Sequence, residues 1–136
     1  MNRSTETPDN PSTLWKSVGG RNWVESQQLI DHLFKPIEGL LAKAVECQSP
    51  QRVLDIGCGT GTLAFAAAEN AAPGGRVTGV DVSAPLLEIA QTRAAGNDAV
   101  TFIEADAAAF QADTPFDTAI SRFGVMFFAE PAPAFA

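Results

Sequence analysis

The sequence predicts an α/β fold in which a doubly wound parallel sheet of four strands follows a pair of helices. Two observations predict this fold. An apolar run at 52–57 leads into a glycine-rich turn and then into an Ala-rich stretch at 62–70 that lacks Gly and Pro, as expected for a buried strand followed by a helix. Three further apolar runs, at 76–82, 100–106 and 116–122, have the composition of strands.

The turn after the first strand carries glycine at three alternate positions, Gly57, Gly59 and Gly61, with Asp55 just ahead of them. Glycine tolerates positive φ and lets another molecule approach the backbone closely. A strand, a glycine turn and a helix N-terminus together form a site for part of a nucleotide-like ligand. The Asp55 carboxylate would either orient the loop or meet a ligand cation. A tight turn without any ligand is the alternative.

The glycine spacing separates two chemistries. A dinucleotide fingerprint, G-x-G-x-x-G, places its third glycine where this chain has Thr62. The pattern G-x-G-x-G, preceded by Asp55, instead resembles motif I of the class I S-adenosylmethionine-dependent methyltransferases. A nicotinamide-dependent oxidoreductase remains an alternative, because it would use the same strand–turn–helix unit.

The second strand ends in Asp81, 20 residues after Gly61. At the carboxyl end of that strand, the carboxylate would lie beside the glycine turn and accept both ribose hydroxyls of an adenosyl group. The alternative is a solvated Asp that caps the following helix, but Ser83 already offers that cap, with Pro85 in the first helical turn. We expect Val82 to form an apolar wall of the adenine slot.

The third strand also ends in an acid, Asp106, followed by Ala107. The resemblance implies that these two residues contact the adenine amino group, since a carboxylate accepts hydrogen bonds from an exocyclic amine. An Asp that starts the turn at 107–110 is an equally good interpretation.

After the fourth strand, the run Ser121-Arg122-Phe123-Gly124 resembles the small-molecule branch of the family, which includes ubiquinone and menaquinone C-methyltransferases. It lacks the Asn/Asp-Pro-Pro-Tyr signature of enzymes that methylate planar amino groups of nucleic acids or glutamine. Arg122, as a clamp for a substrate anion, and Phe123 are candidate substrate residues. A surface position for Arg122 and a core position for Phe123 are the alternatives.

The resemblance implies a Rossmann-like sheet of seven strands in the order 3-2-1-4-5-7-6, of which this chain supplies 3-2-1-4. We therefore expect an N-terminal part of a longer protein, with strand four as an exposed edge beside an apolar Phe/Met segment. The expected organisation is a polar tail at 1–21, helices at 22–50, and the donor-binding half of a methyltransferase domain at 51–136.

Apolar residues recur at helical spacing between Ile30 and Val45, and Pro36 should divide this stretch into helices at 22–34 and 36–47. In related enzymes such helices form a lid over the donor. The candidates for that role are Trp15, Arg21, Trp23 and Gln27. An ordinary packing helix is the favoured alternative.

The formal net charge of −7 disfavours binding to nucleic acid, which depends on clustered Lys and Arg. No apolar run reaches the length of a membrane span, and 1–12 lacks the features of a signal peptide. Cys47 and Cys58 form neither a metal pattern nor a disulfide framework, so no metal is expected. His32, the sole histidine, is expected on a helix surface. These features are typical of a cytoplasmic enzyme; they leave its oligomeric state open.

The resemblance implies transfer of a methyl group from S-adenosylmethionine to a small-molecule acceptor by direct in-line displacement. Most roles would then be binding roles, and no general base is evident. Gly57, Gly59 and Gly61 would let the methionine part approach the backbone, and Asp55 would lie near its amino group. A truncated donor-binding fragment without activity is a further alternative.

Overall fold

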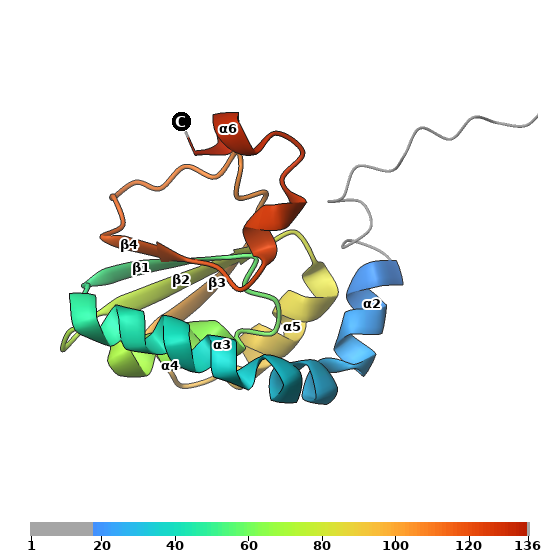
Figure 1. Ribbon diagram of the computed structural model, residues 1–136, viewed down its shortest axis with the longest axis horizontal. Coiled ribbons are helices and arrows are strands. Elements are labelled where there is room, and N and C mark those ends of the chain that lie inside the picture. The colour runs from blue at the N-terminus through green and yellow to red at the C-terminus, as the bar shows by residue number, and fades with distance from the viewer. Residues whose placement is uncertain (1–17, 136) are drawn as a thin grey trace, which may run out of the picture.

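The computed structural model describes residues 18–135 and contains one four-stranded parallel sheet (Figure 1). The strands are β1 (Arg52–Ile56), β2 (Arg76–Asp81), β3 (Val100–Glu104) and β4 (Thr118–Ile120). Their spatial order is β3-β2-β1-β4, and every neighbouring pair is parallel. The predicted fold class and strand order are confirmed.

The register of the sheet brings the functional ends of its strands together. Val53 lies opposite Val77, and Ile56 opposite Val80, so β1 and β2 end side by side. The Val53, Val77 and Val80 side chains are fully or almost fully buried, which explains why these strands are apolar nearly throughout.

Three helices cover one face of the sheet: α3 (Gln27–Gln48), α4 (Thr62–Asn70) and α5 (Ala84–Arg93) (Figure 1). The connection from β3 to β4 runs over the opposite face, as double winding requires, but it consists of turns rather than a helix. The core lies between the sheet and its helices. Its largest members include Val45, Val53, Leu63, Val77, Leu87, Val100, Phe102 and Ile120.

The predicted break at Pro36 is wrong. The chain forms α2 (Val18–Glu25), which starts earlier than expected, and then α3 without interruption through Pro36; the helices divide at Ser26 instead. Pro36 is exposed, so the carbonyl that loses its helical partner can bond to water. Arg122 lies 3.5 Å from Asp31 and 4.0 Å from Glu38, so it contacts α3 on both sides of Pro36.

Strand β4 is shorter than the predicted 116–122 because side chains and backbone strain end it. The Ser121 hydroxyl donates a hydrogen bond to the Ile56 carbonyl at 2.8 Å, beyond the last β1–β4 pair. Phe123 then adopts a φ of 66°, which no strand accommodates. A short 3₁₀ helix, η1 (Gly124–Phe127), and α6 (Pro131–Ala134) follow.

Among the described strands, β4 pairs only with β1, so it forms the edge of the sheet. The apolar segment after it is largely exposed: Met126 retains 68% and Phe135 63% of their accessible surface. The exposed edge beside an apolar Phe/Met segment is therefore present as predicted.

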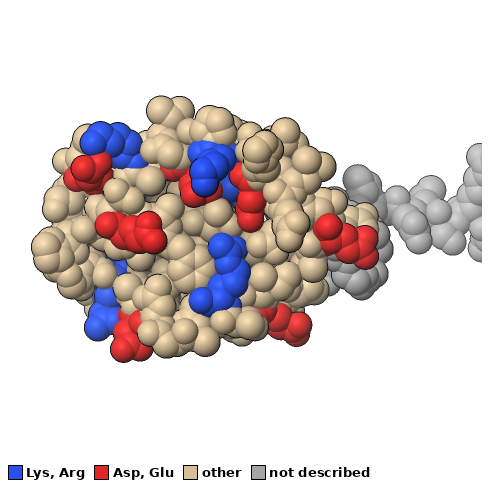
Figure 2. All heavy atoms as spheres, turned by 90° about the horizontal axis from the view of Figure 1, so that it is seen from below, with Lys and Arg blue, Asp and Glu red and all other residues tan. Residues whose placement is uncertain are grey.

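Charges are mixed on the helix-covered side. Seen from that side, Lys and Arg lie among Asp and Glu rather than gathering into one basic patch (Figure 2). Within 18–135, no helix is both long and apolar enough to cross a bilayer.

Replacing Gly39 by Ala should raise the free energy of unfolding by roughly 0.5–1 kcal/mol. Gly39 lies inside α3, and a Cβ there meets nothing within 4 Å, so the change only reduces the entropy of the unfolded chain. Gly79→Ala is the contrasting variant, because its Cβ would lie 2.7 Å from the Phe102 ring. It should destabilise the fold by roughly 1–3 kcal/mol. Urea unfolding measures the change in unfolding free energy for each variant, and changes of the same sign would contradict this packing.

Candidate functional site

The glycine loop has the conformation that its sequence predicts. Gly57, Gly59 and Gly61 have φ values of 70°, 54° and 89°, a region that other residues rarely adopt. A Cβ at Gly57 would lie 2.7 Å from the Gly124 backbone, and one at Gly61 would lie 2.6 Å from the Phe102 ring. At Gly59 a Cβ would meet only Leu86, at 4.0 Å. The outer two glycines are therefore needed for packing, whereas the middle one leaves room for a ligand.

The loop is joined to β2 by backbone hydrogen bonds. The Val80 carbonyl accepts bonds from the N–H groups of Gly57 and Cys58, at 2.9 and 3.0 Å. Cys58 is buried, and this burial raises the pKa of its thiol. The thiol is therefore a packing group in the folded loop rather than a thiolate.

Asp81 holds the loop and the next helix at the same time. One carboxylate oxygen accepts a hydrogen bond from the Gly59 N–H at 2.8 Å, and the other accepts from the Ser83 N–H at 2.9 Å. The expectation that Ser83 caps α5 with its side chain is wrong, since its buried hydroxyl has no partner among the described residues. Desolvation raises the pKa of Asp81, and the backbone N–H bonds oppose this rise.

Asp55 is the most deeply buried acid of the site, with 1% of its surface accessible. Its Oδ2 atom has no hydrogen-bond partner within residues 18–135. Burial raises the pKa of Asp55 from 3.8 to about 7, although the nearby Arg122 cation favours the charged form. Such a carboxyl group suits contact with a cation that enters the site.

Asp106 forms the turn that is one interpretation of its sequence position, and its contact with adenine stays a prediction. Its Oδ1 atom accepts a hydrogen bond from the Ala108 N–H at 2.9 Å, so it does start the predicted turn. Asp106 and Ala107 also line the same pocket as the other acids.

This pocket lies at the carboxyl ends of the strands and brings the predicted donor residues together. Asp55, Gly57, Gly59, Asp81, Val82, Asp106 and Ala107 line it, as do the candidate substrate residues Arg122 and Phe123. Gly61 does not line it. The apolar wall of the pocket is completed by five residues that no sequence motif indicates: Leu63, Val80, Leu86, Phe127 and Phe128. They are ordinary core-type residues in sequence, and only the strand order makes them neighbours.

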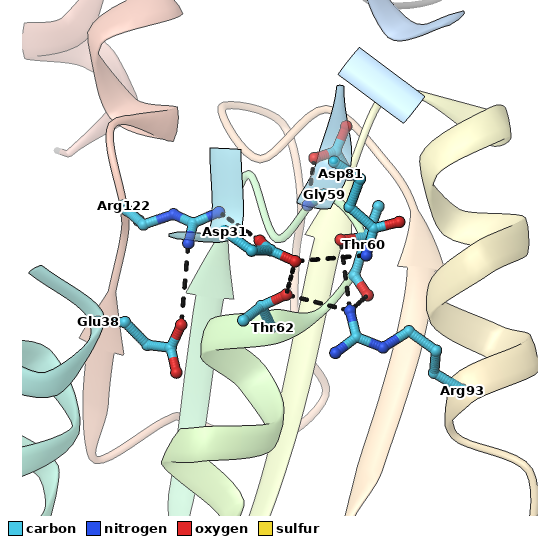
Figure 3. Close-up of polar contacts among 9 residues, drawn as sticks. Asp31, Glu38, Gly59, Thr60, Thr62, Asp81, Arg93 and Arg122 are labelled. Carbon is cyan, nitrogen blue, oxygen red and sulfur yellow. Dashed lines mark hydrogen bonds and ion pairs between the residues drawn. The ribbon is translucent and has the colours of Figure 1, made fainter. Parts of the chain in front are cut away.

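Arg122 is enclosed by α3 rather than lying on the surface. Its guanidinium is 3.5 Å from Asp31 and 4.0 Å from Glu38, over the Phe34 ring, and 13% of its side chain is exposed (Figure 3). The Phe123 ring also packs against Phe34, at a centroid distance of 5.3 Å. Arg122 thus joins β4 to α3 next to the pocket, and its role as an anion clamp stays a prediction.

Helix α2 contributes Trp23 to the pocket, which is where a lid residue would lie. Gln27, another lid candidate, donates a hydrogen bond to Asp31 at 3.4 Å instead. Trp15 lies outside the described residues, as does the Arg21 side chain. No group of three or more His, Cys, Asp and Glu within the described chain is arranged to hold a metal ion.

A model of the methyltransferase domain family matches residues 53–136. The demethylmenaquinone methyltransferase of Thermus thermophilus is 41% identical over 85 residues, which cover 61% of this chain and 38% of that protein. The chain thus spans well under half of that relative's length.

Solved structures agree with this match. An S-adenosylmethionine-dependent methyltransferase from Thiobacillus denitrificans, in complex with S-adenosyl-L-homocysteine, is 29% identical with a TM-score of 0.59, covering 72% of this chain and 40% of that one. Magnesium protoporphyrin IX methyltransferase from Synechocystis has a TM-score of 0.77 at 20% identity, covering 97% and 71%, and shows the shared fold.

Asp55→Asn should remove a pH dependence from the stability of the fold. Because the pKa of Asp55 is higher in the folded than in the unfolded chain, its contribution falls as the pH rises from about 4 to about 7. The variant should match the wild type near pH 4 and exceed its unfolding free energy by up to about 4 kcal/mol near pH 8. Urea unfolding at several pH values measures this difference, and a constant difference would contradict the buried, raised-pKa carboxyl group.

Proposed function

Because this chain belongs to the methyltransferase domain family, we propose that its pocket binds S-adenosylmethionine for methyl transfer to a small-molecule acceptor. The observation that carries the proposal is the convergence of three carboxylates, from Asp55, Asp81 and Asp106, around one glycine loop. The match covers 38% of the curated relative, so the activity of a whole methyltransferase is part of this proposal.

The residues of the pocket fit the donor chemically. S-adenosylmethionine carries a positive sulfonium and an ammonium group, and the pocket is lined by three acids against one arginine. The Asp55 Oδ2 atom lacks a partner among the described residues, and an ammonium group would supply one. Gly59 has no Cβ, so the donor could approach the backbone closely at this point of the loop. Asp81 keeps further lone pairs for ribose hydroxyls, and Asp106 is exposed at the position proposed for adenine.

The donor, when bound, supplies a methyl group that its sulfonium already activates for displacement. The task of the chain is then to hold the donor and acceptor in line and to exclude water, which can lower a barrier by roughly 7–11 kcal/mol. Gly57 and Gly61 keep the loop in shape, and Val82 contributes apolar surface to the pocket. Trp23 on α2 adds an aromatic wall that would limit access of water.

The side of the pocket formed by the segment after β4 is proposed for the acceptor. Phe123, Phe127 and Phe128 line it together with Arg122. These aromatic side chains favour an apolar small molecule, and Arg122 would face an anionic group on it. The net charge of −7 also supports a small molecule rather than a nucleic acid. We place the protein in the cytoplasm on the same grounds of composition.

Asp81→Asn should weaken binding of S-adenosylmethionine by roughly 1–3 kcal/mol, because an amide accepts fewer and weaker hydrogen bonds from the ribose and from Gly59. Titration calorimetry with S-adenosylmethionine measures the loss. NADH should show no binding to the wild-type chain, and tighter binding of NADH than of S-adenosylmethionine would favour an oxidoreductase domain.

Asp117→Asn is the matched control for this experiment. The Asp117 carboxylate also accepts two backbone N–H bonds, from Gln51 and Arg52 at 2.8 Å each, but at the opposite end of β1. This variant should lose stability and keep its affinity for the donor. Unchanged affinity in Asp81→Asn would refute the ribose role.

A further inference from the structure

Thr62 occupies the position at which a dinucleotide fingerprint has its third glycine, and in this chain its hydroxyl connects two charged groups. The Thr62 hydroxyl donates a hydrogen bond to the Asp31 carboxylate of α3 at 3.1 Å. It accepts one from the Arg93 guanidinium of α5 at 3.0 Å. The donor and acceptor capacities of the hydroxyl are thus both used, with an anion on one side and a cation on the other.

Arg93 links this contact to the glycine loop. The same guanidinium nitrogen donates to the Thr60 carbonyl at 2.9 Å, so it bridges the residues on both sides of Gly61 (Figure 3). The Cζ atom of Arg93 lies 5.1 Å from the Phe65 ring centre, a cation–π contact that favours this position of the guanidinium. The Arg93 side chain therefore joins the two residues that flank Gly61, whose φ is 89°.

Asp31 carries the connection on to the other side of the pocket. Its second carboxylate oxygen is 3.5 Å from Arg122 at the end of β4. A continuous chain of polar contacts thus runs from Arg93 through Thr62 and Asp31 to Arg122, and it passes beneath the loop that carries Gly59 (Figure 3). Three elements that lie far apart in sequence meet at one hydroxyl.

We infer that Thr62 is a positioning residue for the donor loop, which it holds in its binding shape by joining Asp31 of α3 to Arg93 of α5. This inference rests on the proposed function, because it assigns the loop to the donor. Asp81 holds the loop at Gly59, and Thr62 holds it just after Gly61. Loss of either contact should therefore make the adjoining part of the loop more mobile.

The test compares Thr62→Val, which keeps the shape and loses the hydroxyl, with Thr62→Ser, which keeps the hydroxyl. Calorimetry with S-adenosylhomocysteine should show roughly tenfold weaker binding for the valine variant, since the hydrogen bonds lost are to charged groups. The serine variant should remain within about twofold of the wild type. Amide hydrogen exchange without any ligand should be faster at Gly59 and Gly61 in Thr62→Val and unchanged in Thr62→Ser.

Thr118→Val and Arg52→Met are matched controls. The Thr118 hydroxyl also bonds to α3, at Gln48 and 2.7 Å, but at the amino end of the strands. Arg52 also donates to two backbone carbonyls, those of Thr114 and Pro115, and lies over a Phe ring. Both should lower the melting temperature and leave ligand affinity and loop exchange unchanged, whereas Arg93→Met should reproduce the Thr62→Val effects.

Two results would overturn the inference. One is wild-type affinity and wild-type loop exchange in Thr62→Val; the other is an equal loss of affinity in Thr118→Val, which would trace the effect to general stability. Absence of ligand binding by the wild-type chain would refute the proposed function instead, and the exchange of Gly59 and Gly61 would then decide the role of Thr62 by itself. If Thr62→Val does not fold, Arg93→Met and its control Arg52→Met carry the same comparison.

Discussion

The site depends on one backbone atom, the carbonyl oxygen of Val80. It accepts hydrogen bonds from two successive N–H groups, those of Gly57 and Cys58, beyond the end of the β1 ladder. This double acceptance turns the chain out of the sheet and sends Gly59 toward the carboxylate of Asp81. The turn needs positive φ at its glycines, and it needs β1 and β2 in the register that places Ile56 opposite Val80. The positions of Gly57 and Gly59 along the pocket therefore follow from this junction.

The electrostatic character of the pocket follows from the same geometry. Parallel strands end at one edge of a sheet, so acids that terminate them are brought together even when they lie far apart in sequence. Asp81 offsets its burial with two N–H bonds, whereas Asp55 has an oxygen without a partner in the described chain. The two acids therefore differ in their contacts. Asp81 holds the loop, whereas Asp55 has an oxygen that could accept a hydrogen bond from a cation.

The four strands were predictable from local apolar runs, and their order followed from the family that the glycine turn resembles. Most of the predicted donor residues line one pocket, and their contacts with a donor stay a prediction. The course of α3 was not predicted, because it depends on the exposure of Pro36 and on long-range neighbours such as Arg122, which lies near both Asp31 and Glu38. The end of β4 was also missed, since it depends on the Ser121 hydroxyl reaching the Ile56 carbonyl. The contact between Thr62 and Asp31 joins residues 31 positions apart, and nothing in either segment alone indicates it.

Cys58 lies at the centre of the bend, and its Sγ atom would be only 2.9 Å from a Cβ at Gly79. Its thiol is buried and disfavours ionisation, so an alkylating reagent would react with it slowly while the bend is closed. Cys47, which is exposed on α3, has no such protection. Alkylation of Cys47 would give the rate for an exposed thiol, and the slower alkylation of Cys58 would report opening of the loop.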